Sequence, residues 1–251
     1  MGKRTGWLPR SAAASVMALA MTLATAATAD TAAPQRPLLL ELFTSQGCSS
    51  CPPADALLRE LSSRDDLLPL AFHVDYWNGL GWVDPFSSPA YTARQQAYAT
   101  RKGFEVYTPQ LVVEGHSDVI GSSRADVSAA IASARHEARG AACSIRRQGG
   151  EVSIEIGAAA AAGDGAAADV YLLSFDSSDR SRIGGGENSG RELVYVNVVR
   201  SLRKIGEWHQ RPLSLVEHLQ AGESGDRLAL LVQERSGTVW AVASTPPAGA
   251  N

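Results

Sequence analysis

A chain of 251 residues is long enough for one large domain or two small ones, and its 45% apolar and 20% charged residues are typical of a globular protein with a core. The formal net charge of −3 and the lack of long basic runs argue against nucleic acid as the main partner. The chain has three cysteines, and its five histidines are scattered without the H-x3–5-H spacing of zinc ligands, which argues against a structural zinc site.

Residues 1–29 have the pattern of a secretory signal peptide. Three basic residues precede an Ala/Met/Leu-rich segment, and the tripeptide ending at Ala29 matches an A-x-A cleavage site. We predict cleavage after Ala29 and a periplasmic or secreted protein with no membrane contact after cleavage. Cleavage removes three of the 23 basic residues and none of the 26 acidic ones, so the net charge becomes −6. The alternative is an uncleaved membrane anchor, which the short, Ser/Thr-interrupted apolar segment disfavours.

The segment 38–61 predicts a buried strand, a sharp turn and a helix. Its apolar run at 38–43 is of strand length, and Cys48 and Cys51 follow in C-x-x-C spacing. Pro52 and Pro53 suit the first turn of a helix, where a backbone N–H has no intrahelical partner to lose. The helix positions that follow carry one apolar face.

This placement predicts reactive thiols. A helix N-terminus stabilises a thiolate, and the pKa of a cysteine in such a motif falls from about 8.5 toward ~3.5–7.5. We expect Cys48 to be the outer, exposed nucleophile and Cys51 the resolving thiol. In an oxidising compartment the pair is more readily a disulfide or dithiol than half of a zinc site.

Residues 67–76 predict a second strand, joined to the first by a right-handed parallel crossover. Asp75 lies at its end, before the Gly/Trp-rich loop 77–85. Ligands of open α/β sheets bind at the carboxyl edge of the strands, where Cys48 also emerges. The tryptophans of the loop could contribute to such a site, or they could cover the end of the core.

A helix is predicted from Ser88 to Lys102, with Gly103 as its stop. A β-hairpin is predicted next, from strands at 110–113 and 119–121 joined by a turn at 114–117. An amphipathic helix over 124–139 then closes this part of the chain.

Together these features resemble the thioredoxin fold in its short, glutaredoxin-like form: a C-x-x-C after the first strand, Thr108-Pro109 before a hairpin strand, and a final helix. The resemblance covers residues 37–140 and implies an α/β domain with a central mixed sheet. It also implies that Pro109 follows a cis peptide bond and that the loop of Thr108 and Pro109 lies against the cysteines and accepts the substrate backbone.

The sequence departs from thioredoxins in three respects. Ser49-Ser50 replaces the usual Gly-Pro, Gly47 replaces a tryptophan, and the buried acid has no secure counterpart, although Asp75 could relay protons to Cys51. More narrowly, LFTSQGCSSCPPAD, HVDYWNGLGWVDPF, YTPQLVVEG and GENSGRELVYVNVVR resemble the exported, thioredoxin-like DUF1223 family. That family resemblance implies no particular reaction.

From residue 141 to 246 the pattern changes to period two, which predicts an all-β, sandwich-like domain after a junction at 140–142. The Ala/Gly-rich residues 158–168 predict a hairpin tip. Gly184–Arg191 predicts a loop between strands, with a role beside the active site as the alternative. Cys143 is interpreted as a buried thiol, with a reactive thiol as the alternative. Six strands are predicted, at 144–148, 152–157, 168–175, 192–199, 227–233 and 239–244.

The predicted function is thiol–disulfide exchange on exported proteins, through Cys48 and Cys51 with Thr108, Pro109 and Asp75 in support. The partners are protein thiols or disulfides and a redox partner that the sequence does not define; no organic cofactor and no metal are required. Two alternatives remain open. One is a copper-binding module that uses both thiolates, and the other is an inactive scaffold with a structural disulfide. Neither the redox direction nor the oligomeric state follows from the sequence.

Overall fold

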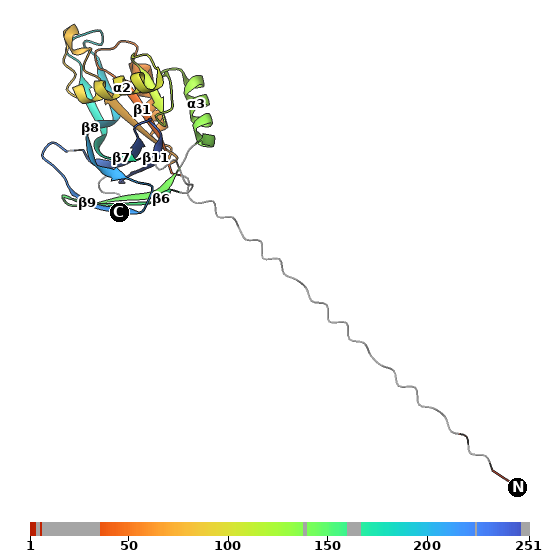
Figure 1. Ribbon diagram of the computed structural model, residues 1–251. Helices are drawn as coiled ribbons and strands as arrows, with labels where there is room; N and C mark the ends of the chain where they lie inside the picture. The colour runs from red at the N-terminus through yellow and green to blue at the C-terminus, as the bar shows by residue number, and fades with distance from the viewer. Residues whose placement is uncertain (4–5, 7–35, 138–139, 160–166, 224, 247–251) are drawn as a thin grey trace. The chain divides into compact units, whose positions relative to one another are not determined.

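The computed structural model describes residues 1–3, 6, 36–137, 140–159, 167–223 and 225–246 (Figure 1). The described residues from 36 onward form one compact unit. Most of the predicted signal peptide, and residues 160–166 of the predicted hairpin tip, lie outside the described residues. Within the described parts of the chain, no helix is long and apolar enough to cross a membrane.

The centre of the fold is an eight-stranded mixed sheet with the order β11-β10-β7-β8-β2-β1-β3-β4. β1 pairs with β2 in parallel, and β2 pairs with β8 in parallel, whereas the other neighbours are antiparallel. The predicted parallel β–α–β unit and the central mixed sheet are therefore confirmed. The strands are β1 (Leu38–Thr44), β2 (Leu67–His73), β3 (Gln110–Val113), β4 (Ser117–Ile120), β7 (Ala168–Arg182), β8 (Glu192–Trp208), β10 (Arg227–Glu234) and β11 (Val239–Ser244).

Helices cover both faces of the sheet. Alternate residues of β1 point to opposite faces, and because most of them are apolar, each face has side chains that pack against a helix. Leu38, Leu40 and Leu42 pack with the apolar faces of α1 (Pro52–Leu61) and α3 (Arg124–Glu137). Leu39 and Phe43 pack on the other side, in a core shared with Tyr91 and Tyr98 of α2 (Pro89–Lys102). A single 3-10 turn, η1 (Asn78–Leu80), lies in the loop between β2 and α2.

A second, three-stranded antiparallel sheet has the order β5-β6-β9, formed by β5 (Ala141–Gln148), β6 (Glu151–Ala159) and β9 (Leu213–His218). Val152, Ile154 and Ile156 of β6 pack against Leu172 and Leu230 of the large sheet. Leu173 and Leu231, the next residues on those strands, belong to the hydrophobic core that includes Tyr91 and Tyr98 of α2. The small sheet therefore covers the face of the large sheet opposite α2.

The predicted division into a domain at 37–140 and a separate sandwich at 141–246 differs from this arrangement. Two sheets do pack face to face in the second half, but one of them is the large sheet that also contains β1 and β2. Ala71 of β2 pairs directly with Val198 of β8. Alternation along a strand predicts that the strand exists, but it does not predict which strand becomes its neighbour.

The strands β7 and β8 are also longer than predicted, at 15 and 17 residues. The added residues are 176–182 of β7, which are serine, arginine and aspartate, and 200–208 of β8, four of which are charged, so no apolar alternation marked them as strand. The hairpin ends in the loop 183–191, which we call the cap loop. The added residues of β7 pair with the first half of β8, and this longer hairpin brings the cap loop to the turn that follows β1.

Candidate functional site

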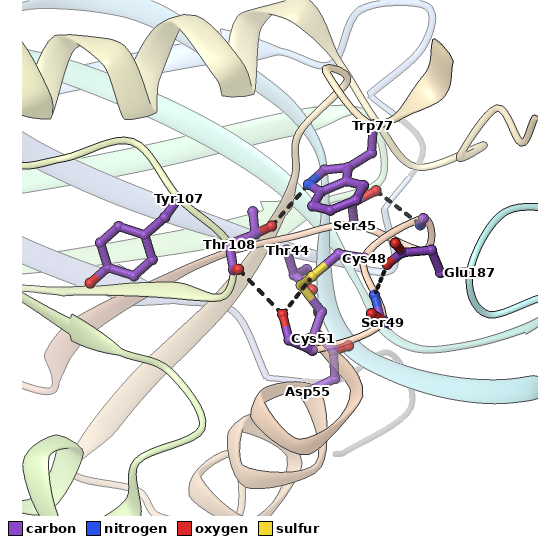
Figure 2. The surroundings of a disulfide bond; sticks show 12 residues. Thr44, Ser45, Cys48, Ser49, Cys51, Asp55, Trp77, Tyr107, Thr108 and Glu187 are labelled. Atoms are coloured by element: carbon purple, nitrogen blue, oxygen red, sulfur yellow. Dashed lines mark hydrogen bonds between the residues drawn. A yellow bond between two sulfur atoms is a disulfide. The ribbon is translucent and has the colours of Figure 1, made fainter. Parts of the chain in front are cut away.

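Cys48 and Cys51 form a disulfide in the turn between β1 and α1, with their Cα atoms 5.5 Å apart (Figure 2). Cys51 is the N-cap of α1, and Pro52 and Pro53 occupy the first helical positions, as predicted. Both cysteines are fully buried, with 0% of their surface exposed. The expectation that Cys48 is exposed is therefore wrong; the two intervening serines are the exposed residues of the turn.

The cap loop covers Cys48 by holding the backbone of its turn. The side-chain amide of Asn188 donates hydrogen bonds to the carbonyl oxygens of Gln46 (3.0 Å) and Cys48 (2.8 Å). The carboxylate of Glu187 accepts a hydrogen bond from the backbone N–H of Ser49 (3.0 Å). Arg191 donates to Oδ1 of Asn188 (2.8 Å), which orients the amide. Gly184–Arg191 is thus a loop between strands, as predicted, and it contacts the C-x-x-C turn.

The glycines of the cap loop allow a close approach to the loop after β2. A Cβ atom at Gly185 would lie 2.3 Å from the carbonyl oxygen of Gly81, and one at Gly184 would lie 2.8 Å from the ring of Trp82. The indole of Trp82 donates a hydrogen bond to Oε1 of Gln46 (2.9 Å). Trp82 therefore connects the cap loop to the turn that carries the cysteines.

The peptide bond between Thr108 and Pro109 is cis, as the thioredoxin resemblance implied. The indole of Trp77 donates to Oγ1 of Thr108 (2.9 Å), which fixes this loop beside the disulfide (Figure 2). The hydroxyl of Ser50 lies 3.3 Å from Sγ of Cys48 and donates to the carbonyl oxygen of Thr108 at 3.5 Å. The sequence-predicted Cys48, Cys51, Thr108 and Pro109 thus meet at one place.

Among the described residues, Asp75 makes no hydrogen bond to the cysteine turn or to the Thr108–Pro109 loop. The carboxylate of Asp75 accepts a hydrogen bond from Thr92 of α2 (2.5 Å). The buried carboxyl group of the site belongs instead to Asp55, one turn along α1 from Cys51 (Figure 2). Asp55 could have been found in the sequence, because a residue four positions after Cys51 on a helix lies on the same side.

Burial raises the pKa of Asp55 to about 6, although the charge of His73 and a hydrogen bond from Thr44 to Oδ1 (2.9 Å) oppose the rise. Asp55 is therefore half protonated near pH 6. It can donate a proton below that pH, and it carries a buried negative charge above it.

A buried polar cluster lies next to Asp55. Nδ1 of His73 is 2.7 Å from Oδ2 of Asp84, and both side chains are almost completely buried. Burial would raise the pKa of Asp84, but the charge of His73 and hydrogen bonds from His73 and from the N–H groups of Gln46 and Phe86 outweigh it and hold the pKa below its usual range. The ring of Tyr195 from β8 stacks edge-on against His73, with centroids 4.9 Å apart. No local pattern in the sequence indicates these partners of His73.

Cys143 is a partly buried free thiol at the edge of the small-sheet core. Burial raises its pKa to about 11, so the thiol stays protonated at neutral pH. This state favours the interpretation of Cys143 as an inert core thiol over that of a reactive one.

No group of three or more His, Cys, Asp or Glu side chains within the described ranges could hold a metal ion.

The fold and the site define a mixed α/β protein with a C-x-x-C disulfide buried beneath a loop from the distant half of the chain. The chain belongs to the family described as "Protein of unknown function (DUF1223)", whose profile matches residues 39–233. The crystal structure of protein AGR_C_4864 from Agrobacterium tumefaciens is similar, with 30% sequence identity and a TM-score of 0.71. The match covers 87% of this chain and 97% of that one. A search of curated proteins finds no match.

We expect Asn188→Ala to destabilise the protein by about 1–3 kcal/mol, because two buried carbonyl oxygens lose their donor. The same change should speed reduction of the disulfide by dithiothreitol about tenfold, equivalent to about 1.4 kcal/mol less free energy for opening the cap loop. Chemical unfolding and thiol trapping during reduction would measure the two effects.

Asn197→Ala is the matched control for this variant. Asn197 is also a buried asparagine, but it lies in β8. Its amide donates a hydrogen bond to the carbonyl oxygen of Pro69 (2.7 Å) and not to the cysteine turn. Its loss should lower stability without speeding reduction of the folded protein. Equal acceleration in both variants would mean that reduction follows general loosening and not the cap loop.

Proposed function

We propose that this protein is a thioredoxin-like thiol–disulfide oxidoreductase that acts on exported proteins through Cys48 and Cys51. The observation that carries the proposal is the meeting of the disulfide with the cis-proline loop, through the hydroxyl of Ser50, which lies between Sγ of Cys48 and the carbonyl oxygen of Thr108. A structural disulfide alone would not require this loop beside it.

The exchange would run in two steps. A thiolate of a partner attacks Sγ of Cys48, a mixed disulfide forms, and Cys51 leaves as a thiolate. A second thiolate of the partner then attacks the mixed disulfide and releases Cys48, so the partner loses two electrons and the Cys48–Cys51 pair gains them. The reverse direction starts from Cys48 as the nucleophile and uses Cys51 to resolve the mixed disulfide.

Asp55 is the proposed proton donor to Cys51, in place of Asp75. Asp55 is buried beside the disulfide, and its pKa of about 6 keeps part of the population protonated near neutral pH. Asp75 bonds to α2 instead. Export after cleavage at Ala29 and protein partners that carry thiols or disulfides remain part of the proposal, without a membrane or nucleic-acid partner.

One observation favours a second candidate, a scaffold with a structural disulfide: both cysteines are completely buried in the oxidised state. An exchange reaction requires the cap loop or the serines of the turn to move. The two candidates therefore differ in how readily the disulfide is reduced.

The midpoint potential of the Cys48–Cys51 pair separates the two candidates. Protein without residues 1–29 would be equilibrated in graded glutathione buffers, with free thiols trapped and counted by mass. A Cys143→Ser background keeps the third cysteine out of the count. We expect a reversible two-electron transition between about −120 and −270 mV, the range of working oxidoreductases. A pair that stays oxidised below about −300 mV would overturn the proposal in favour of the structural disulfide.

A further inference from the structure

Gln46 of the turn keeps Nε2 without a hydrogen-bond partner among the described residues, and three further buried side chains behind the turn each keep one such polar atom. These atoms are Oδ2 of Asp55, Nε2 of His73 and the hydroxyl of Tyr195. They come from α1, β2 and β8, the three elements that meet behind the C-x-x-C turn. Buried polar groups in folded proteins are nearly always hydrogen-bonded to protein or to ordered water, so three in one neighbourhood require an explanation.

We propose that Asp55, His73 and Tyr195 bind one water molecule between them and that this hydrated trio controls the proton on Asp55. The water site is independent of the proposed function. The delivery of that proton to Cys51 rests on the proposed function, because it requires reduction of the disulfide.

The hydrogen-bonding capacity of the three atoms matches that of one water. In the neutral form of His73, Nδ1 carries the proton, because the carboxylate of Asp84 accepts hydrogen bonds, and Nε2 is left as an acceptor. Oδ2 of Asp55 is a second acceptor, because Thr44 already donates to Oδ1. The hydroxyl of Tyr195 is a donor. A water can donate to both acceptors and accept from the hydroxyl, and three partners are typical of a buried water.

The contacts around the trio show that its members are close enough to act together. The rings of His73 and Tyr195 are 4.9 Å apart. Thr44, which donates a hydrogen bond to Oδ1 of Asp55, is the strand partner of His73. Burial raises the pKa of Tyr195, and the charges of Asp55 and Asp84 raise it further, so the hydroxyl remains a donor. The other charged groups that act on these three side chains are Arg59 of α1, Asp179 of β7 and Arg191 of the cap loop.

In the exchange reaction, the S–S bond breaks and Cys51 leaves as a thiolate. The proton of the Asp55 carboxyl group moves to that thiolate, which leaves Asp55 negatively charged. The bound water stabilises the new carboxylate by donating a hydrogen bond. In the reverse direction Asp55 takes the proton back as the disulfide forms, so protons and electrons balance without a further reactant.

Tyr195→Phe tests the water site, because it removes only the hydroxyl, which makes no hydrogen bond to the described protein. The titration of Asp55 would be followed in the oxidised protein by the carboxyl ¹³C shift of labelled aspartate. Loss of the signal in Asp55→Asn assigns it. We expect Tyr195→Phe to raise the titration midpoint by about one pH unit, a tenfold change in proton affinity, because the carboxylate loses a well-held water. High-resolution diffraction of the wild type should show the water itself.

Tyr91→Phe is the matched control. Its hydroxyl is also buried, but it donates to the carbonyl oxygen of Val199 (3.0 Å) on the α2 side of the sheet. We expect this variant to lose stability and to keep the Asp55 titration, which is the opposite pattern. If Tyr195→Phe instead stabilises the protein and leaves the titration of Asp55 unchanged, no water is bound to the Tyr195 hydroxyl and the proposal is wrong. The titration uses oxidised protein, so this result stands whether or not the cysteines exchange with a partner.

Discussion

Cys51→Ser is expected to abolish turnover and to trap Cys48 in a stable mixed disulfide. Without the Cys51 thiol, an adduct at Cys48 has no internal nucleophile to resolve it. Incubation of the variant with oxidised glutathione, followed by mass spectrometry under non-reducing conditions, should show one glutathione per chain on the peptide that contains Cys48. Any catalysed disulfide reduction in an insulin assay should be lost completely.

Cys48→Ser is the informative comparison. If Cys48 is the attacking thiol, this variant also loses turnover but accumulates much less adduct. The remaining thiol, Cys51, is the N-cap of α1 and is buried, so it reacts poorly with glutathione. Both variants would carry Cys143→Ser, so that the third thiol cannot take part. Equal adducts on either cysteine would assign no preferred nucleophile, and adduct mainly on Cys51 would reverse the proposed roles.

The largest expected loss of stability comes from Arg94→Met. Arg94 of α2 forms a buried ion pair with Glu41 of β1, with atom pairs at 2.5 and 3.0 Å, and it also donates to Gln233 of β10 (2.9 Å). Its removal leaves the Glu41 carboxylate buried with only the hydroxyl of Tyr98 as a donor among the contacts described here. Loss of one partner of a buried ion pair costs about 3–5 kcal/mol, which denaturant unfolding would measure.

The double variant Glu41→Leu/Arg94→Met separates charge from packing. If the cost comes from the uncompensated carboxylate, removal of both charges should recover most of the lost stability, because apolar replacements of buried pairs are often tolerated. A double variant as unstable as Arg94→Met would show instead that the hydrogen bonds of Arg94 across three elements carry the stability.

The elements near the cysteines could be predicted because their signals are local. The apolar run before the turn, the paired prolines after Cys51 and the helix pattern of residues 88–102 each describe a few neighbouring residues. The structure has β1, α1 and α2 at those places. The cis bond before Pro109 came from the resemblance to thioredoxins, since most X-Pro bonds are trans.

What could not be predicted depends on contacts between distant residues. Asn188 binds the carbonyl oxygen of Cys48, 140 positions away, and no short motif marks that contact. The same holds for the partnership of His73 with Asp84 and Tyr195. The burial of Cys48 follows from these contacts, so a reasonable expectation for a helix N-terminus failed. β9 was missed as well, although the alternation of Leu213 and Leu215 was present.

The pairing of β2 with β8 has a consequence for the order in which the molecule assembles. Ala71 must find Val198, a contact of large sequence separation, whereas the β1–α1–β2 unit needs only neighbouring chain. Contacts between residues that are far apart in the sequence form slowly, because the ends of a long loop must first be brought together. We therefore expect the local unit to form first, with its cysteine pair still accessible, and the cap loop to close over the C-x-x-C turn only after the hairpin of β7 and β8 has paired with β2.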